Sequence, residues 1–264
     1  IEPHSIFDVS KPMQVGKYII KDHEPFNGEL NTKEIIVKSS NIGISKIADK
    51  IRKKNQQNFF KKIGFYKKIE LEIDETAIPL TNKNNWGRLE TMTIAYGHGF
   101  AITPLHLANA YASLVNGGFK INPSLIRGEN RSLLKEKILK NSTSIYVREL
   151  LNAVITETNY TGPRVKIEGY EIGGKTGTAE LIDKTGRYLD DANRTTFASV
   201  FPISNPKYAL IAIINNPKKI KEENYSITSA TVVAPLIKEI IISMIKILGI
   251  PPNLKNETLK ASIQ

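Results

Sequence analysis

The chain has no cysteine, a single tryptophan and no long hydrophobic run among its 264 residues. The absence of cysteine excludes disulfides, iron–sulfur ligation and a thiol nucleophile, and we expect no redox chemistry. The longest apolar stretches, 208–214 and 234–248, are shorter than the roughly 20 residues that span a bilayer. We therefore expect no membrane anchor within these residues.

Acidic residues are in the minority, with 26 Asp and Glu against 37 Lys and Arg, which gives a formal net charge of +11. Such an excess can serve a polyanion partner, but the lysines are spread over the whole chain, often singly within apolar segments. We interpret them as solvated faces and expect no nucleic acid partner. No cluster of His or carboxylate residues has metal-ligand spacing, so we expect neither a metal nor another cofactor.

The periodicity of apolar residues predicts helices first, then strands, then one more helix. Helical spacing marks 32–52, as one helix or as two that share a break near Ser40, with Thr32 available as an N-cap. It also marks 103–117, 141–158 and 229–248. Three short β-rich runs precede the last helix, at 170–181, 195–201 and 208–214. Consecutive strands with short links favour antiparallel pairing, and this order predicts an α+β fold with an antiparallel sheet flanked by helices.

Residues 169–176 satisfy the phosphate-loop pattern G-x-x-x-x-G-K-[ST]. That loop requires a helix to start at its lysine, so that backbone N–H groups and the helix dipole face the phosphate. Gly177 stands where the first turn of this helix would lie, and the chain reaches Gly186 before a useful helix length. The strand at 210–214 also ends in asparagines rather than in a magnesium-binding aspartate. A nucleotide-binding protein is therefore the weakest hypothesis for this chain.

The same residues suit a strand at the edge of a cleft. Lys175-Thr176-Gly177-Thr178 would present an ammonium, two hydroxyls and a backbone N–H to a carboxylated substrate. Upstream, Ser39 and Asn41 form a Ser-x-Asn pair in the middle of a predicted helix, where both residue types are poor helix formers. The pair alone is a weak signal, but the pair followed by Lys-Thr-Gly-Thr at the start of an antiparallel run is a strong one.

With these two motifs the chain resembles the transpeptidase domain of class B penicillin-binding proteins, most closely the type that builds the division septum. The resemblance extends from end to end through the segments 37–46, 96–99, 103–105, 107–112, 116–118, 197–202, 205–206 and 234–235. It implies the fold of the serine β-lactamases and penicillin-binding proteins. It also implies a peptidoglycan D,D-transpeptidase, in which a serine attacks the D-Ala-D-Ala bond of a stem peptide and an amine then takes the acyl group.

The resemblance also implies roles for the motif residues. Ser39 would pass a proton to the leaving amine, Asn41 would bind the substrate backbone, and Lys175 would tune the electrostatics of the cleft. Thr176 and Thr178 would bind the terminal carboxylate beside Gly177, and the Thr178 N–H would be half of an oxyanion hole. The implied partners are lipid II-derived stem peptides, β-lactams as inhibitors, and a glycosyltransferase with other division proteins. The implied location is the bacterial cell envelope, at the periplasmic face of the inner membrane.

One family motif is missing where the resemblance requires it. The nucleophile lies in Ser-x-x-Lys, which should precede Ser39, yet no serine before that residue has a lysine three positions on. The spacing occurs only downstream, at Ser132 with Lys135, Ser204 with Lys207 and Ser243 with Lys246. We therefore expect a partial transpeptidase domain at 1–252 and a tail at 253–264, without the nucleophile helix and the first strands of the sheet.

Three consequences follow from that expectation. The isolated chain should be inactive and should form no covalent adduct with a fluorescent penicillin. The strand at 208–214 should lack a neighbour and expose an apolar edge, which favours aggregation.

The alternative hypothesis is a non-catalytic relative that serves as a division scaffold.

Overall fold

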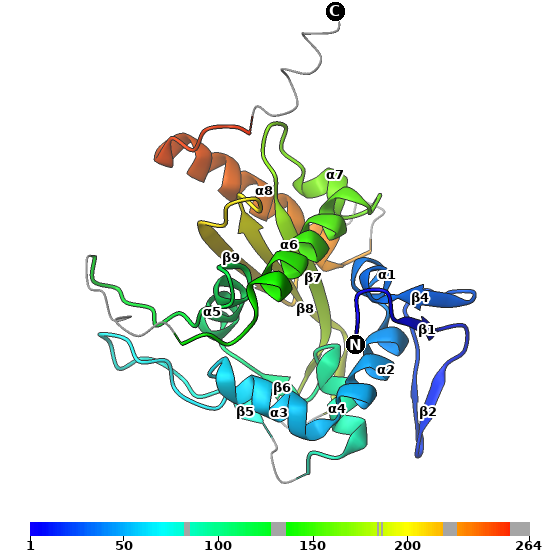
Figure 1. Cartoon of the computed structure of the whole chain (residues 1–264). Helices are drawn as coiled ribbons and strands as arrows, with labels where there is room; N and C mark the ends of the chain where they lie inside the picture. Colours follow the sequence, from blue (N-terminus) through cyan, green and yellow to red (C-terminus); the bar gives the residue numbers. More distant parts are fainter. Residues whose placement is uncertain (82–84, 128–135, 184, 186, 219–225, 254–264) are drawn as a thin grey trace, which may run out of the picture. The chain divides into compact units, whose positions relative to one another are not determined.

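The structure is a computed structural model that describes residues 1–81, 85–127, 136–183, 185, 187–218 and 226–253 (Figure 1). The chain divides into two compact units, Ile1–Ser144 and Ile145–Gln264. Each unit has its own helices and strands, and each is described by itself.

The first unit combines three two-stranded antiparallel sheets with short helices. Its strands are β1 (Ile6–Asp8), β2 (Met13–Val15), β3 (Tyr18–Ile20), β4 (Glu29–Asn31), β5 (Leu80–Thr81) and β6 (Phe100–Ala101), paired as β1–β4, β2–β3 and β5–β6. Its helices are α1 (Thr32–Lys38), α2 (Asn41–Ile51), α3 (Lys53–Lys62), α4 (Arg88–Ala95) and α5 (Pro104–Val115). The helix α6 (Asn141–Thr156) begins at the end of this unit.

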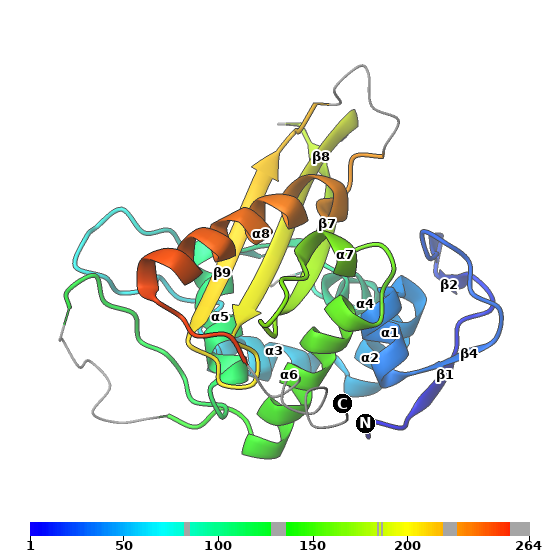
Figure 2. The same ribbon diagram turned by 90° about the horizontal axis from the view of Figure 1, so that it is seen from above.

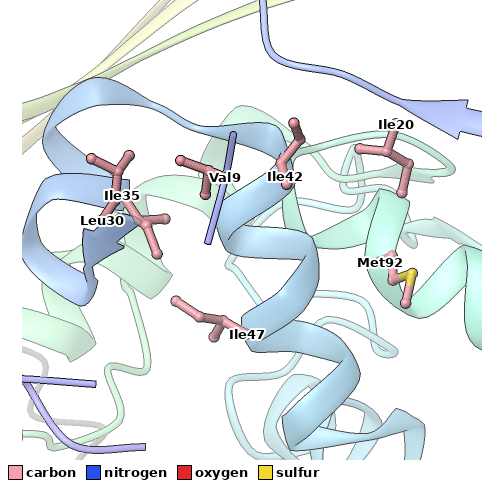
Figure 3. Close-up of a cluster of buried hydrophobic side chains, with 7 residues drawn as sticks. All are labelled: Val9, Ile20, Leu30, Ile35, Ile42, Ile47 and Met92. Atoms are coloured by element: carbon pink, nitrogen blue, oxygen red, sulfur yellow. The ribbon is translucent and has the colours of Figure 1, made fainter. Parts of the chain in front are cut away.

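One hydrophobic core of the first unit holds α1, α2 and α4 to the short strands. Figure 3 shows its buried members, which come from six different segments: Val9, Ile20, Leu30, Ile35, Ile42, Ile47 and Met92. Gly43 permits a close contact within this core, because a Cβ added there would lie 2.6 Å from Cγ1 of Ile35. The start of α2 is therefore packed directly against α1.

A second core of the first unit is aromatic. Phe60, Phe65 and Phe100 have ring centroids within 6 Å of one another, and Trp86 contacts two of these rings edge-on. Trp86 is 2% exposed and donates its indole N–H to Thr91 Oγ1 at 3.1 Å. Trp86 is therefore a core residue whose polar atom has a partner.

The second unit is built on a three-stranded antiparallel sheet in the order β7 (Gly173–Ile182), β8 (Tyr188–Phe201) and β9 (Tyr208–Asn215). The long helix α8 (Ser229–Leu248) packs against all three strands (Figure 2). The short α7 (Gly162–Val165) contacts α8. The described part of the sheet leaves β7 at one edge and β9 at the other, which agrees with the expected edge at 208–214.

Most helix predictions are confirmed, with one correction at a cap. A break near Ser40, one of the two alternatives for 32–52, separates α1 from α2, and α5, α6 and α8 lie within the predicted ranges. The N-cap of α1 is Asn31 rather than Thr32: Asn31 Oδ1 accepts the Glu34 N–H at 3.0 Å, and the Glu34 carboxylate accepts the Asn31 N–H at 2.9 Å. This reciprocal pair satisfies two donors at the start of α1.

The C-terminal boundary is partly described. Gly249 ends α8 with a φ of 60°, and the Asn253 N–H donates to the Gly169 carbonyl at 2.7 Å. The predicted tail begins at this anchored residue, and 254–264 lie outside the described residues.

Candidate functional site

The Ser-x-Asn motif forms the turn between α1 and α2, and we call residues 39–41 the serine turn. Ser39 caps the C-terminal end of α1 in the left-handed conformation, with φ 57° and ψ 43°. Ser40 is the N-cap of α2, and Asn41 is the first residue of that helix. The motif therefore lies at a helix junction and not within a helix, which explains how these poor helix formers are accommodated.

Ser39 and Ser40 differ sharply in environment. Ser39 is exposed, whereas Ser40 is 1% exposed. Ser40 Oγ accepts the Gly43 N–H at 2.9 Å and donates to Asp22 Oδ2 at 2.8 Å. Ser40, the middle residue of the motif, thus has a structural role. Ser39 and Asn41 lie on either side of this hydrogen-bonded residue.

Asp22 holds the start of α2 from a distant part of the first unit. Its Oδ1 accepts the Ile42 N–H at 3.0 Å, while its Oδ2 accepts the Ser40 hydroxyl. The neighbouring Lys21 carbonyl accepts Asn41 Nδ2 at 3.2 Å. A carboxylate at a helix N-terminus is favourable to both the free N–H groups and the helix dipole.

The Lys-Thr-Gly-Thr motif lies on β7, at the edge of the described sheet. Its partners on β8 run without interruption from Gly173 opposite Val200 to Glu180 opposite Asn193. Because β7 pairs only with β8 in the described sheet, no strand of that sheet covers its outer edge.

Strand alternation places the lysine and the threonines on opposite faces of β7. A Cβ added at Gly173 would meet Leu151 of α6, and Lys175 and Gly177 share this face. Thr176 and Thr178 share the other face, where Thr178 Oγ1 accepts the backbone N–H of Ser229 at the start of α8, at 3.0 Å. The sequence motif alone does not show that Lys175 lies on one face of β7 and Thr176 and Thr178 on the other.

Lys175 has an unusual electrostatic environment for a lysine. Its side chain is half-buried and its Nζ donates to the Thr176 carbonyl at 3.2 Å. Burial lowers the pKa of Lys175 from the ordinary 10.5 to about 8. A shift of this kind marks functional sites more often than ordinary surfaces.

Lys175 and Thr176 lie between two glycines, and the reason for a glycine differs between the two positions. A Cβ at Gly174 would lie 2.6 Å from the Phe197 ring, so packing of the sheet requires glycine there. A Cβ at Gly177 would meet nothing closer than 3.9 Å, and its φ is not in the left-handed region. Glycine at an open strand position is typical of a site that a ligand approaches closely.

The phosphate-loop hypothesis disagrees with the structure. Lys175 and Thr176 lie within a β-strand, so no helix N-terminus faces a phosphate at this lysine. The downstream Ser-x-x-Lys pairs lie elsewhere: Ser243 is in α8, Ser204 is in the connection between β8 and β9, and Ser132 lies outside the described residues.

Two of the four histidines have structural environments. His98 lies between two glycines with positive φ, in the turn after α4. His106 is 2% exposed, with Nε2 2.9 Å from the Lys67 carbonyl and Nδ1 2.7 Å from Thr103 Oγ1.

Within the described residues no group of three His, Cys, Asp or Glu side chains could hold a metal ion. In the same residues, no helix has both the length and the apolar content of a membrane span.

Sequence reasoning missed Asp22 and Ser229. Both act through contacts between residues that are far apart in the chain, and neither belongs to a local motif. A fixed carboxylate close to a buried serine could be found only from the fold.

Comparison with known proteins shows the fold and the family of the chain. The apo transpeptidase domain of penicillin-binding protein 3 from Burkholderia pseudomallei superimposes with a TM-score of 0.84 at 24% identity, covering 95% of this chain and 74% of that one. The fold is therefore the mixed α+β fold of penicillin-binding transpeptidase domains. Residues 2–241 also match the family described as the penicillin binding protein transpeptidase domain, and the chain belongs to this family.

Curated relatives carry more specific names. A peptidoglycan D,D-transpeptidase FtsI homolog from Mesostigma viride is 31% identical over 262 residues, which cover 88% of this chain and 42% of that protein. A probable peptidoglycan D,D-transpeptidase FtsI from Caulobacter vibrioides is 30% identical over 254 residues, covering 93% and 43%. The chain thus spans less than half the length of each of these two relatives.

Proposed function

We propose that this chain supplies the Ser-x-Asn and Lys-Thr-Gly motifs of a serine-type peptidoglycan D,D-transpeptidase. The observation that carries the proposal is that a chain of this family contains both motifs, and that each has an unusual local geometry. Ser39 is exposed at a left-handed helix end, and Lys175 is half-buried on an edge strand with a pKa lowered to about 8.

The proposed chemistry is acyl transfer in two steps. A serine hydroxyl attacks the carbonyl between the two D-alanines, the C–N bond breaks, and D-alanine leaves with a proton on its amine. The amine of a second stem peptide then attacks the ester, releases the serine and forms the cross-link. Ser39 passes the proton toward the leaving amine, and Asn41 hydrogen-bonds the peptide backbone of the donor.

The third motif recognises the charged end of the donor. The Lys175 ammonium attracts the terminal carboxylate, and the Thr176 and Thr178 hydroxyls have hydrogens to donate to it. The Thr178 N–H serves as one oxyanion donor, which in such sites is typically worth about a hundred- to a thousand-fold in rate. Open space at Gly177 supports an extended substrate beside the edge of β7.

The wider role follows the names of the relatives. We propose that the parent protein acts in septal peptidoglycan synthesis in the cell envelope, on stem peptides of lipid II-derived strands and with β-lactams as inhibitors. Its partners would include a glycosyltransferase and other division proteins. In this proposal residues 1–252 are a partial transpeptidase domain, and 253–264 follow it as a tail.

The test is binding to the chain itself. We expect an acylated D-Ala-D-Ala peptide and benzylpenicillin to shift the backbone amide resonances of the serine turn and of residues 175–178. Matched peptides ending in L-Ala-L-Ala should leave these resonances unchanged. Loss of the distinction between the two peptides would contradict the proposal.

Mass spectrometry after incubation with penicillin tests the nucleophile separately. We expect no adduct, because the chain has no Ser-x-x-Lys before Ser39. A stoichiometric adduct would show that a serine of this chain is the nucleophile and would refute the expected truncation. Selective binding without an adduct fits a partial transpeptidase domain and equally a scaffold. A search of the gene before Ile1 for a Ser-x-x-Lys motif separates these two.

A further inference from the structure

We infer that Asp22 is a positioning residue of this site, which fixes the directions in which the Ser39 and Asn41 side chains leave the backbone. The inference rests on the proposed function of those two residues. Asp22 belongs to neither motif and lies 17 to 19 positions before them in the chain.

Three contacts tie the segment at residues 21 and 22 to the serine turn and to Ile42, the residue that follows it. The Asp22 carboxylate accepts the Ser40 hydroxyl at 2.8 Å and the Ile42 N–H at 3.0 Å. The Lys21 carbonyl accepts Asn41 Nδ2 at 3.2 Å. This last bond uses one amide hydrogen of Asn41 and so sets the direction of Oδ1, the acceptor that a substrate N–H would meet.

Ser40 carries the effect of the carboxylate into the helix. Its hydroxyl donates to Asp22 and at the same time accepts the Gly43 N–H, so the oxygen has a defined hydrogen direction. Ser40 is 1% exposed, and loss of the carboxylate would leave a buried donor without its acceptor. The carboxylate therefore determines the geometry of the first turn of α2.

The conformation of Ser39 makes this restraint necessary. Left-handed backbone at a non-glycine residue is disfavoured and persists only where its surroundings impose it. On one side α1 imposes it, because the N–H groups of Ser39 and Ser40 donate to carbonyls of the last turn of α1 at 3.3 and 3.0 Å. On the other side the start of α2 is held through Asp22.

The clamp is itself anchored in the core. Asp22 follows β3, whose last residue Ile20 is 4% exposed in the same cluster as Ile42. The carboxylate thus has a fixed location relative to α2. Glu24, only two residues further on, is exposed, so it offers the same charge change on the same segment as a control.

The experiment compares Asp22→Asn, Asp22→Ala and Glu24→Gln in the 264-residue chain. Amide hydrogen exchange at Ile42 reports the clamp, and titration with the acylated D-Ala-D-Ala peptide reports its consequence. We expect exchange at Ile42 to accelerate about tenfold or more in Asp22→Ala, and peptide affinity to fall about fivefold or more. Asp22→Asn keeps one acceptor for the Ile42 N–H and should lie between Asp22→Ala and the unaltered chain, while Glu24→Gln should match the latter.

Two further variants separate positioning from a general loss of stability. Glu90→Ala removes the capping carboxylate of α4, which accepts the Gly87 N–H at 2.7 Å and does not touch the serine turn. It should lower the melting temperature while leaving peptide affinity unchanged. In a double-mutant cycle, Asp22→Ala and Ser40→Ala together should weaken binding by clearly less than the product of their separate effects, because each breaks the same contact.

Each outcome distinguishes the two proposals. If the unaltered chain binds the peptide and Asp22→Ala binds it equally well, the positioning role is wrong. Unchanged exchange at Ile42 in Asp22→Ala would also overturn it. If the unaltered chain does not bind the peptide, the proposed function fails, and exchange at Ile42 still decides whether Asp22 holds the turn.

Discussion

Thr178 Oγ1 accepts the backbone N–H of Ser229 at 3.0 Å, which joins the last residue of the Lys-Thr-Gly-Thr motif to the first turn of α8. The N–H groups of a first helical turn have no partner within the helix, so a side-chain acceptor there stabilises it. The hydroxyl still has its own hydrogen to donate. One residue can therefore support the fold and bind a carboxylate at the same time.

Substitution of Thr178 should separate these two roles. Thr178→Val removes the acceptor and should lower the free energy of unfolding by about 1 kcal/mol, as loss of a helix cap does. Thr178→Ser keeps the hydroxyl and should cost clearly less. Urea denaturation measures both variants, and equal stabilities for them would show that the contact to Ser229 contributes nothing.

The sequence predicts the helices that have clear boundaries. Thr103-Pro104 opens α5, and Gly249 ends α8 in the left-handed conformation, because proline suits a first turn and glycine a last one. The helix α3 has no such boundary residues. Its only apolar side chains are two adjacent phenylalanines, and its N-cap residue Arg52 has a φ of 70° and makes no side-chain cap hydrogen bond. Its stability comes from the aromatic core, which only the fold assembles.

The short strands of the first unit could not be predicted for a related reason. Each has two or three residues, and β1 pairs with β4 across more than twenty positions. Such pairing depends on distant residues and leaves little local pattern. At the site, the strand that carries Lys175 was predictable, and the separation of its faces follows from alternation alone. The contact of Thr178 with α8 and that of Asp22 with Ser40 required the fold.

Gly43, two residues after the serine turn, should not tolerate a larger side chain. Gly43→Ala would place a Cβ 2.6 Å from Ile35 Cγ1 in a filled core, and we expect a loss of about 1–3 kcal/mol of stability. Gly177→Ala is the matched control, because open space surrounds that position and the loss should stay within about 0.5 kcal/mol. Thermal denaturation compares the two, and a large loss in Gly177→Ala would contradict the open strand edge.

The backbone of Ser39 predicts a trade of function for stability. Glycine adopts left-handed backbone without penalty, so Ser39→Gly should raise the free energy of unfolding by up to about 1 kcal/mol, whereas Ser39→Ala should not. Both variants remove the hydroxyl proposed to carry the proton. Chemical denaturation of the pair isolates the backbone contribution, and a less stable glycine variant would show that the hydroxyl itself supports the fold.

The lowered pKa of Lys175 predicts a pH window in which the stability of the chain changes. The folded chain releases this proton near pH 8, while the unfolded chain keeps it to about pH 10.5, so folding is favoured as the pH rises through that interval. Below pH 8 the cost of burying the charge is fully present. Lys175→Met should therefore be more stable than the unaltered chain at pH 7, and the difference should disappear as the pH approaches 10.5. Lys207→Met, at an exposed lysine in the same unit, is the matched control for the loss of one lysine. Denaturation of the three proteins between pH 7 and 10.5 measures it, and a constant difference for Lys175→Met would mean that the ammonium is not desolvated.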